Sequence, residues 1–145
     1  MIFFDASAAA KRYFLEIGSD MVAELWHGPE FFSSLTILHC ELMSAVNRKL
    51  RERAISQAAF RSLKTQIGHD LRKLHAVPVD AGLIEIVLSL LDSHPLKAVG
   101  ALYLAGALSL KRATREPVLF VSADRQLLRA AAGEGLRTLD PEKAG

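Results

Sequence analysis

Two short apolar runs, each followed closely by an aspartate, constrain the fold of this chain more than any other feature. The run IFF (2–4) ends at Asp5, and the run VLFV (118–121) stops three residues before Asp124. Apolar runs of this length without polar alternation are typical of strands that are buried on both faces. Such strands belong to parallel sheets that helices cover on both sides.

The segments between these runs predict helices and further strands in alternation. Strands are expected at 2–4, 30–34, 75–79, 118–121 and 136–140. Helices are expected at 7–16 (with Ser7 as N-cap), 19–27, 35–53, 56–74, 81–92, 96–112 and 123–135. Strands that alternate with helices pair in parallel through right-handed crossovers. We therefore predict an α/β fold of three layers, with a short central parallel sheet between helical layers.

The length and composition narrow the class of protein. The 145 residues fit one domain, residues 1–140, followed by a short tail, 141–145, that is expected to be frayed. No apolar run reaches the ~18 residues of a membrane span, and the opening MIFFDAS is unlike a signal peptide. Cys40 is the single cysteine, so no internal disulfide can form; a cytoplasmic location is expected, with Cys40 in the core. The net charge of +2 permits a nucleic-acid partner without requiring one.

Asp5 and Asp124 lie where an α/β sheet places its ligand site, at the carboxyl ends of strands. Two carboxylates there can hold a hard divalent cation such as Mg²⁺ or Mn²⁺, which prefers oxygen ligands. An aspartate before a helix is also a common N-cap that suits the helix dipole. Either residue alone is therefore more easily explained as a cap than as a ligand.

Glu41 stands out because it falls at the centre of the apolar stripe of the helix expected at 35–53. A carboxylate on an apolar face is costly unless it is paired or binds a metal. Both interpretations stay open, with Arg48 on the same face as the candidate ion-pair partner. The position of Arg48 also makes it a candidate contact for a phosphate, whereas most of the basic residues that follow are expected to be solvated.

Taken together, four segments resemble the PIN-domain family, in particular the VapC-type toxins of bacterial type II toxin–antitoxin pairs. MIFFDASAAAKRYFLEIGS resembles the family's opening strand, acid, serine and helix, and SSLTILHCELMSAVNRKL is similar to its Ser-x6-Glu segment. LKAVGALYLAGAL resembles the family's "LRAxDALHLAxAL" helix. VLFVSADRQLLRAAAGEGLRTLDP is similar to its final strand, acid, helix and closing strand. The four segments occur in the family's order and run nearly end to end.

The resemblance implies a metal-dependent endoribonuclease that hydrolyses RNA phosphodiester bonds with Mg²⁺ or Mn²⁺. On matching positions the catalytic metal ligands are Asp5, Glu41 and Asp124, with Ser7 and Ser122 as supporting hydroxyls. The implied partners are a cognate antitoxin that neutralises the toxin, an RNA substrate such as tRNA, and a second copy of the chain. A homodimer and a higher assembly with the antitoxin are therefore expected, without a membrane.

The family's remaining acid falls on Gly100, which makes this a disabled position of the implied site. Glycine costs a helix interior about 1 kcal/mol, and close packing is a reason for Gly106 but not evidently for Gly100. Either the chain is a naturally degenerate nuclease, or Gly100 arose or was introduced as a change from Asp; use of another acid, such as Asp92, is a third account. The alternative function is a catalytically dead domain that binds RNA or the antitoxin. A purely structural partner domain would leave Glu41 unexplained.

Overall fold

The central sheet holds five parallel strands in the order β3-β2-β1-β4-β5 within residues 1–143, which the computed structural model describes. The strands are β1 (Ile2–Phe4), β2 (Phe32–Leu35), β3 (His75–Val77), β4 (Leu119–Val121) and β5 (Arg137–Leu139). From β1 the chain adds β2 and β3 on one side, and it then adds β4 and β5 on the other side, with β4 paired directly to β1. The carboxyl ends of β1 and β4 are therefore neighbours at a topological switch point.

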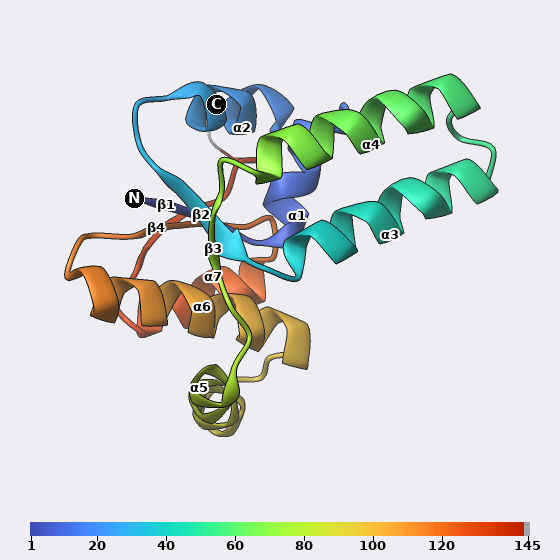
Figure 1. The fold of residues 1–145 in the computed structure, drawn as a ribbon. Coiled ribbons are helices and arrows are strands. Elements are labelled where there is room, and N and C mark those ends of the chain that lie inside the picture. Colours follow the sequence, from blue (N-terminus) through green and yellow to red (C-terminus); the bar gives the residue numbers. More distant parts are fainter. Residues whose placement is uncertain (144–145) are drawn as a thin grey trace.

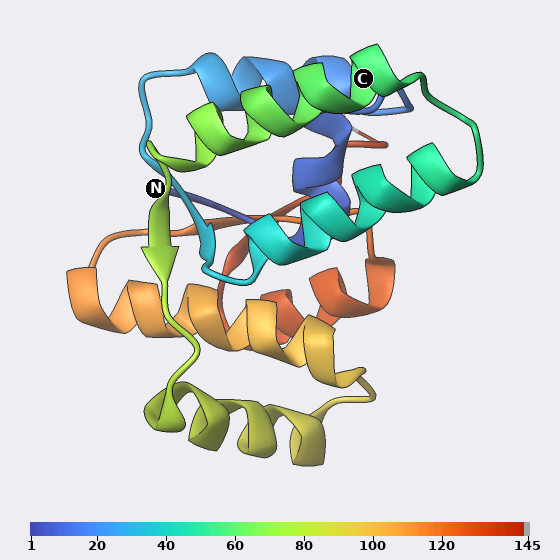
Figure 2. The same ribbon diagram turned by 45° about the vertical axis from the view of Figure 1, so that its right-hand side comes forward.

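Helices cover both faces of the sheet, so the predicted three-layer α/β fold is confirmed (Figures 1 and 2). One layer contains α1 (Ala6–Ala9), the 3₁₀ helix η1 (Ala10–Arg12), α2 (Ser19–His27), α3 (Leu38–Arg51) and α4 (Gln57–Leu71). The other layer contains α5 (Ala81–Ser93), α6 (Ala98–Thr114) and α7 (Arg125–Gly133). No helix within residues 1–143 combines the length and the apolar character that crossing a membrane requires.

Side chains that alternate along β1 and β4 build two separate cores. Phe3 and Phe120 face the layer of α5, α6 and α7, and their rings stack with centroids 6.1 Å apart. Phe4 and Val121 face the layer of α1 to α4. Since successive strand residues point to opposite faces, both faces need apolar residues, which explains the unbroken apolar runs.

The junction of β2 and α3 differs from the prediction of a helix that begins at residue 35. Leu35 is the last residue of β2, is completely buried and pairs with Val77 of β3. The helix begins only at Leu38. Helical periodicity assigned Leu35 to the helix, but its pairing with Val77 places it in the sheet. Val77 is far away in the sequence, so a pattern of neighbouring residues does not contain this contact.

Gly106 and Gly100 of α6 occupy different surroundings. A Cβ atom at Gly106 would lie 2.5 Å from Leu35 Cδ2 and 2.9 Å from Phe3 Cζ, so this glycine lets α6 approach the sheet closely. A Cβ atom at Gly100 would meet only Leu127, at 3.7 and 3.8 Å, which is ordinary contact. Packing therefore requires glycine at position 106 and not at position 100.

Two smaller expectations are wrong. Cys40 is exposed on α3 instead of lying in the core. Residues 141–143 form a turn in which Glu142 lies 2.8 Å from the buried Lys11 amine, so the expected fraying does not apply to them. The remainder of the expected tail, 144–145, lies outside the described residues.

Candidate active site

Asp5 forms the centre of the candidate site, directly after β1. Its backbone is extended, and its Oδ1 accepts a hydrogen bond of 2.9 Å from the Ala8 N–H, so Asp5 is the N-cap of α1. The prediction of Ser7 as the cap is wrong. The cap lies two residues earlier because Asp5 ends the strand and caps the helix with the same side chain.

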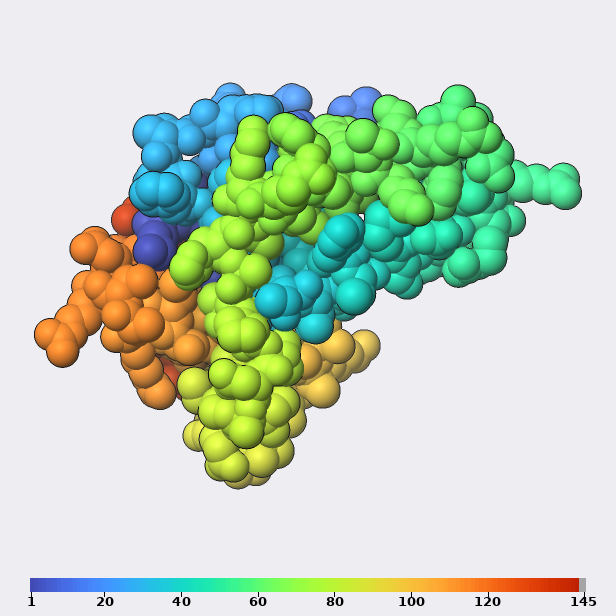
Figure 3. Space-filling view, viewed as in Figure 1, coloured from blue at the N-terminus to red at the C-terminus, as the bar shows by residue number. Residues whose placement is uncertain are grey.

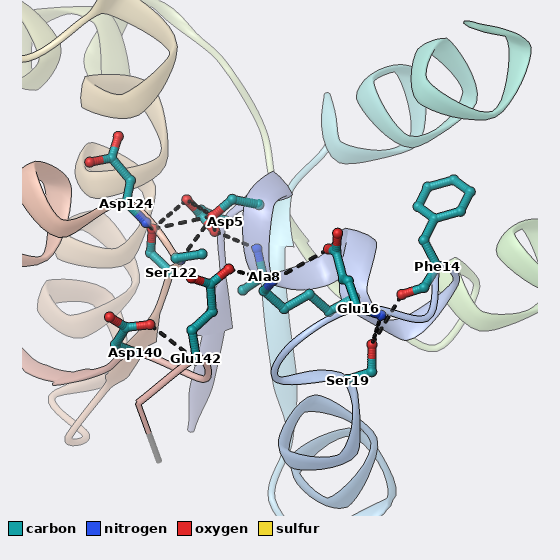
Figure 4. A network of polar contacts seen from close by, with 12 residues as sticks. Asp5, Ala8, Phe14, Glu16, Ser19, Ser122, Asp124, Asp140 and Glu142 are labelled. Atoms are coloured by element: carbon teal, nitrogen blue, oxygen red, sulfur yellow. Dashed lines mark hydrogen bonds and ion pairs between the residues drawn. The ribbon is translucent and has the colours of Figure 1, made fainter. Parts of the chain in front are cut away.

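Two serine hydroxyls hold Asp5 against the end of β4 (Figure 4). Ser7 donates to Asp5 Oδ1 at 2.8 Å, with Oδ2 at 2.9 Å, and Ser122 donates to Oδ2 at 2.7 Å. Each serine oxygen also accepts a backbone N–H from the turn after β4, from Ala123 to Ser7 and from Asp124 to Ser122, both at 3.0 Å. These contacts fix the ends of two neighbouring strands to each other.

Burial raises the pKa of the Asp5 carboxyl and so makes it a weaker acid than an exposed aspartate. The side chain is only 5% exposed, and loss of water raises its pKa. The hydrogen bonds from Ser122, Ala8 and Ser7 oppose this rise, while the nearby negative charge of Asp124 adds to it. The pKa of Asp5 is raised overall, because burial outweighs the hydrogen bonds.

Asp124 lies at the same edge but faces solvent. Its Oδ1 caps α7 by accepting hydrogen bonds from the N–H groups of Gln126 at 2.9 Å and Leu127 at 3.1 Å. The predicted cap therefore exists, and it does not exclude a second role, since the side chain is exposed. The capping bonds fix the carboxylate in one orientation beside Asp5.

Glu41 comes from the first turn of α3 and is held by Tyr103 of α6, whose hydroxyl donates to Glu41 Oε2. Glu41 is half-buried and lies beside the buried stripe of Leu38, Leu42 and Val46 instead of at its centre. Burial, the hydrogen bond to Glu41 and the negative charge of Asp5 raise the pKa of Tyr103, so this phenol stays neutral and donates. The proximity of Asp5 to this pair brings Glu41 to the same site.

Tyr103 was missed by sequence reasoning, although a signal exists. It is the only side chain with a hydroxyl in the apolar stretch LKAVGALYLAGAL, and it lies one helical turn after Gly100. The alternative of an ion pair between Glu41 and Arg48 is wrong. Within residues 1–143 the partner of Glu41 is Tyr103, and Arg48 is exposed to solvent.

Position 100 lies beside the site, at the beginning of α6. It shares a helix face with Tyr103, and it faces Leu127, one turn after Asp124 on α7. A Cβ atom at this position would meet only the two Leu127 methyl groups, at ordinary contact distance. Glycine adds no side chain of its own to this site, so the polar group that α6 contributes is the hydroxyl of Tyr103.

The oxygen donors of this site suit a hard divalent cation, because carboxylates and water are the ligands that such cations prefer. Asp5 and Asp124 concentrate negative charge at adjacent strand ends, and Glu41 adds to it from α3. Within the described part of the chain, however, no three Asp, Glu, His or Cys side chains group closely enough to hold one metal ion. A cation here would depend on water molecules for much of its coordination.

Two curated proteins are similar to this chain over almost its whole length. They are "Ribonuclease VapC45" of Mycobacterium tuberculosis strain CDC 1551 / Oshkosh and "Ribonuclease VapC49" of Mycobacterium tuberculosis strain ATCC 25618 / H37Rv. Each is 27% identical to this chain, and each comparison covers 97% of this chain and 99% of the relative. No family model matches the chain.

Proposed function

We propose that this chain is a PIN-type ribonuclease of the VapC kind that hydrolyses RNA phosphodiester bonds with the help of Mg²⁺ or Mn²⁺. The observation that carries the proposal is the pair Asp5 and Asp124 at the switch point between β1 and β4. Ser7 and Ser122 hold the first of these carboxylates, and Glu41 approaches from α3. The similarity to two proteins named ribonuclease over nearly the full length supports the same function.

In this proposal Asp5, Glu41 and Asp124 hold the cation, with Ser7 and Ser122 orienting Asp5. A cation bound there would supply positive charge that favours ionisation of a water and neutralises charge developing on the phosphodiester. Tyr103 keeps Glu41 in place by donating its hydroxyl proton to the carboxylate. Both carboxylate oxygens of the buried Asp5 accept hydrogen bonds, Oδ1 from Ser7 and Ala8 and Oδ2 from Ser122.

We further propose that Gly100 attenuates this activity. Loss of one anionic ligand weakens the hold on a divalent cation, and glycine supplies no carboxylate at position 100. A Cβ atom fits at this position in ordinary contact with Leu127, so the first atom of an aspartate side chain meets no clash there. The expected effect of Gly100 is a loss of activity by orders of magnitude with the fold intact.

The test is cleavage of an unfractionated tRNA pool in Mg²⁺ or Mn²⁺ by the chain and by Gly100→Asp. We expect Gly100→Asp to cut at least about a hundredfold faster, and Gly100→Asn, which has the same size without the charge, to stay near the original rate. Addition of Asp5→Asn to Gly100→Asp should abolish cleavage. Equal rates for the chain and for Gly100→Asp would refute the attenuating role of Gly100.

A second candidate function is a catalytically inactive domain that binds RNA or an antitoxin. The observation that favours it is that no three potential metal ligands group together within residues 1–143. This alternative predicts that neither the chain nor Gly100→Asp cleaves tRNA, although both are folded. In either case, the proposed partners are a cognate antitoxin and a second copy of the chain. The antitoxin would cover the carboxyl ends of β1 and β4, where Asp5 and Asp124 lie.

A further inference from the structure

Positive charge is concentrated in one part of the molecule that the candidate active site does not include. Residues 48–73, here called the basic arm, comprise the end of α3, the turn that follows it, α4 and the two residues after Leu71. The arm contains eight Lys or Arg against two Asp or Glu, whereas the rest of the chain contains ten against fourteen. A nearly neutral chain thus carries a strongly positive arm on an acidic body.

The charges of the basic arm are free for a partner. Within the described residues, none of its eight Lys and Arg side chains forms an ion pair. Lys49 packs over the Phe14 ring, at 4.7 Å, and the other seven are exposed. The carboxylate of Asp70 is buried: one oxygen contacts Tyr13 and Arg12, and the other lies 3.5 Å from Nδ1 of the exposed His69, so none of the eight Lys and Arg of the arm is paired with it. Figure 3 shows the arm projecting from the body of the molecule.

A surface groove of about 680 Å³ runs along α4 in this arm. Its lining consists of polar side chains without a carboxylate: Arg61, Ser62, Thr65, Gln66, His69 and Arg72. The spacing of positions 61, 65, 69 and 72 places them on one face of the helix. Arg61 and Arg72 lie about 16 Å apart along the axis, at 1.5 Å per residue, so the groove has a guanidinium toward each end.

We propose that this groove binds the phosphate backbone of RNA, with Arg61 and Arg72 contacting phosphates and the uncharged side chains between them contacting sugars. The proposal rests on the proposed ribonuclease function and adds a binding surface to it. About half to two-thirds of the hydrogen bonds between proteins and DNA go to phosphate and sugar oxygens, and Arg, Ser, Thr and Gln are among the side chains that make them. The arm begins in the last turns of α3, the helix whose first turn carries Glu41.

An acidic protein segment fits this groove less well. Protein interfaces depend on buried aromatic or aliphatic anchors, and the lining of the groove contains no aliphatic or aromatic hydrocarbon side chain. RNA needs no such anchor, because counterion release from phosphates provides the affinity. The observations therefore favour RNA over a protein partner at this surface.

The test measures binding of fluorescently labelled, unfractionated tRNA in EDTA, by fluorescence anisotropy between 50 and 200 mM KCl. The test variant is Arg61→Gln with Arg72→Gln. The control is Arg112→Gln with Arg137→Gln, which removes the same charge from two exposed arginines outside the arm. We expect the test variant to bind about tenfold more weakly, with a salt slope smaller by about 2, and the control to stay within about twofold of the original chain.

Equal losses in the two variants, or no loss in the test variant, would overturn the proposal. So would a test variant that keeps its affinity for tRNA but loses affinity for poly-L-glutamate, which would assign the groove to an acidic protein. Because binding is measured without a divalent cation, the result is independent of cleavage. Failure of Gly100→Asp to cut tRNA would refute the proposed nuclease and leave the binding measurement standing.

Discussion

The two glycines of α6 make opposite predictions about stability. Replacing Gly100 by Ala adds a Cβ atom in ordinary contact with Leu127 and reduces the freedom of the unfolded chain. We expect a gain of about 0.4–1 kcal/mol in the free energy of unfolding. Replacing Gly106 by Ala places a Cβ atom 2.5 Å from Leu35 and 2.9 Å from Phe3, both completely buried. Overpacking costs about 1–3 kcal/mol, which exceeds the gain of up to about 1 kcal/mol in helix propensity.

The difference between Gly100→Ala and Gly106→Ala should therefore be about 2 kcal/mol. Urea denaturation followed by fluorescence can measure it, because Trp26 is the only tryptophan and is buried. A thermal scan should show shifts of about 3–4 °C per kcal/mol in a chain of this length. The control Ala113→Gly, at an exposed position of the same helix, should cost about 0.5–1 kcal/mol. The packing argument is refuted if Gly106→Ala is as stable as Gly100→Ala.

Two further predictions concern contacts that hold the site and its surroundings. Tyr103→Phe should lower the free energy of unfolding by about 1 kcal/mol, because Glu41 loses a hydrogen bond but regains water; a double-mutant cycle with Glu41→Gln that shows no coupling energy would contradict this. Burial lowers the pKa of Lys11, but its ion pairs with Glu142 and Glu16 outweigh burial and raise the pKa overall. The stabilisation of the folded chain by these ion pairs is therefore complete below about pH 10.5 and is lost as the pH rises further. Glu142→Gln should therefore lower the free energy of unfolding by about 1 kcal/mol at pH 8. In urea titrations, the difference in free energy of unfolding between this variant and the original chain should shrink above about pH 10.5. A difference that stays constant with pH would argue against the ion pair.

The sequence was sufficient for the fold class and for the positions of Asp5 and Asp124. Both follow apolar runs that are buried on both faces, and local periodicity contains that information. The sheet order then brings the two residues together, because strands before and after a switch point share an edge. These features depend on short runs of sequence that consist of apolar residues only.

The sequence was insufficient where a distant contact decides the outcome. Leu35 was assigned to a helix because its pairing with Val77 lies outside any local window. The partner of Glu41 is Tyr103, 62 residues away, and the nearby Arg48 was the only candidate that helical spacing offered. Cys40 was expected in the core from its residue type, but its face of α3 is the exposed one. In each case, the deciding neighbour comes from another element of the fold.

The bond between Ser122 and Asp5 spans 117 residues, and it has a consequence for the order of events during synthesis. Asp5 leaves the ribosome 117 residues before Ser122, which directly follows β4 and stands two residues before Asp124. Contacts at such separation close late, since they carry the largest loop-closure cost. On a nascent chain the candidate site therefore stays incomplete until β4 enters the sheet beside β1.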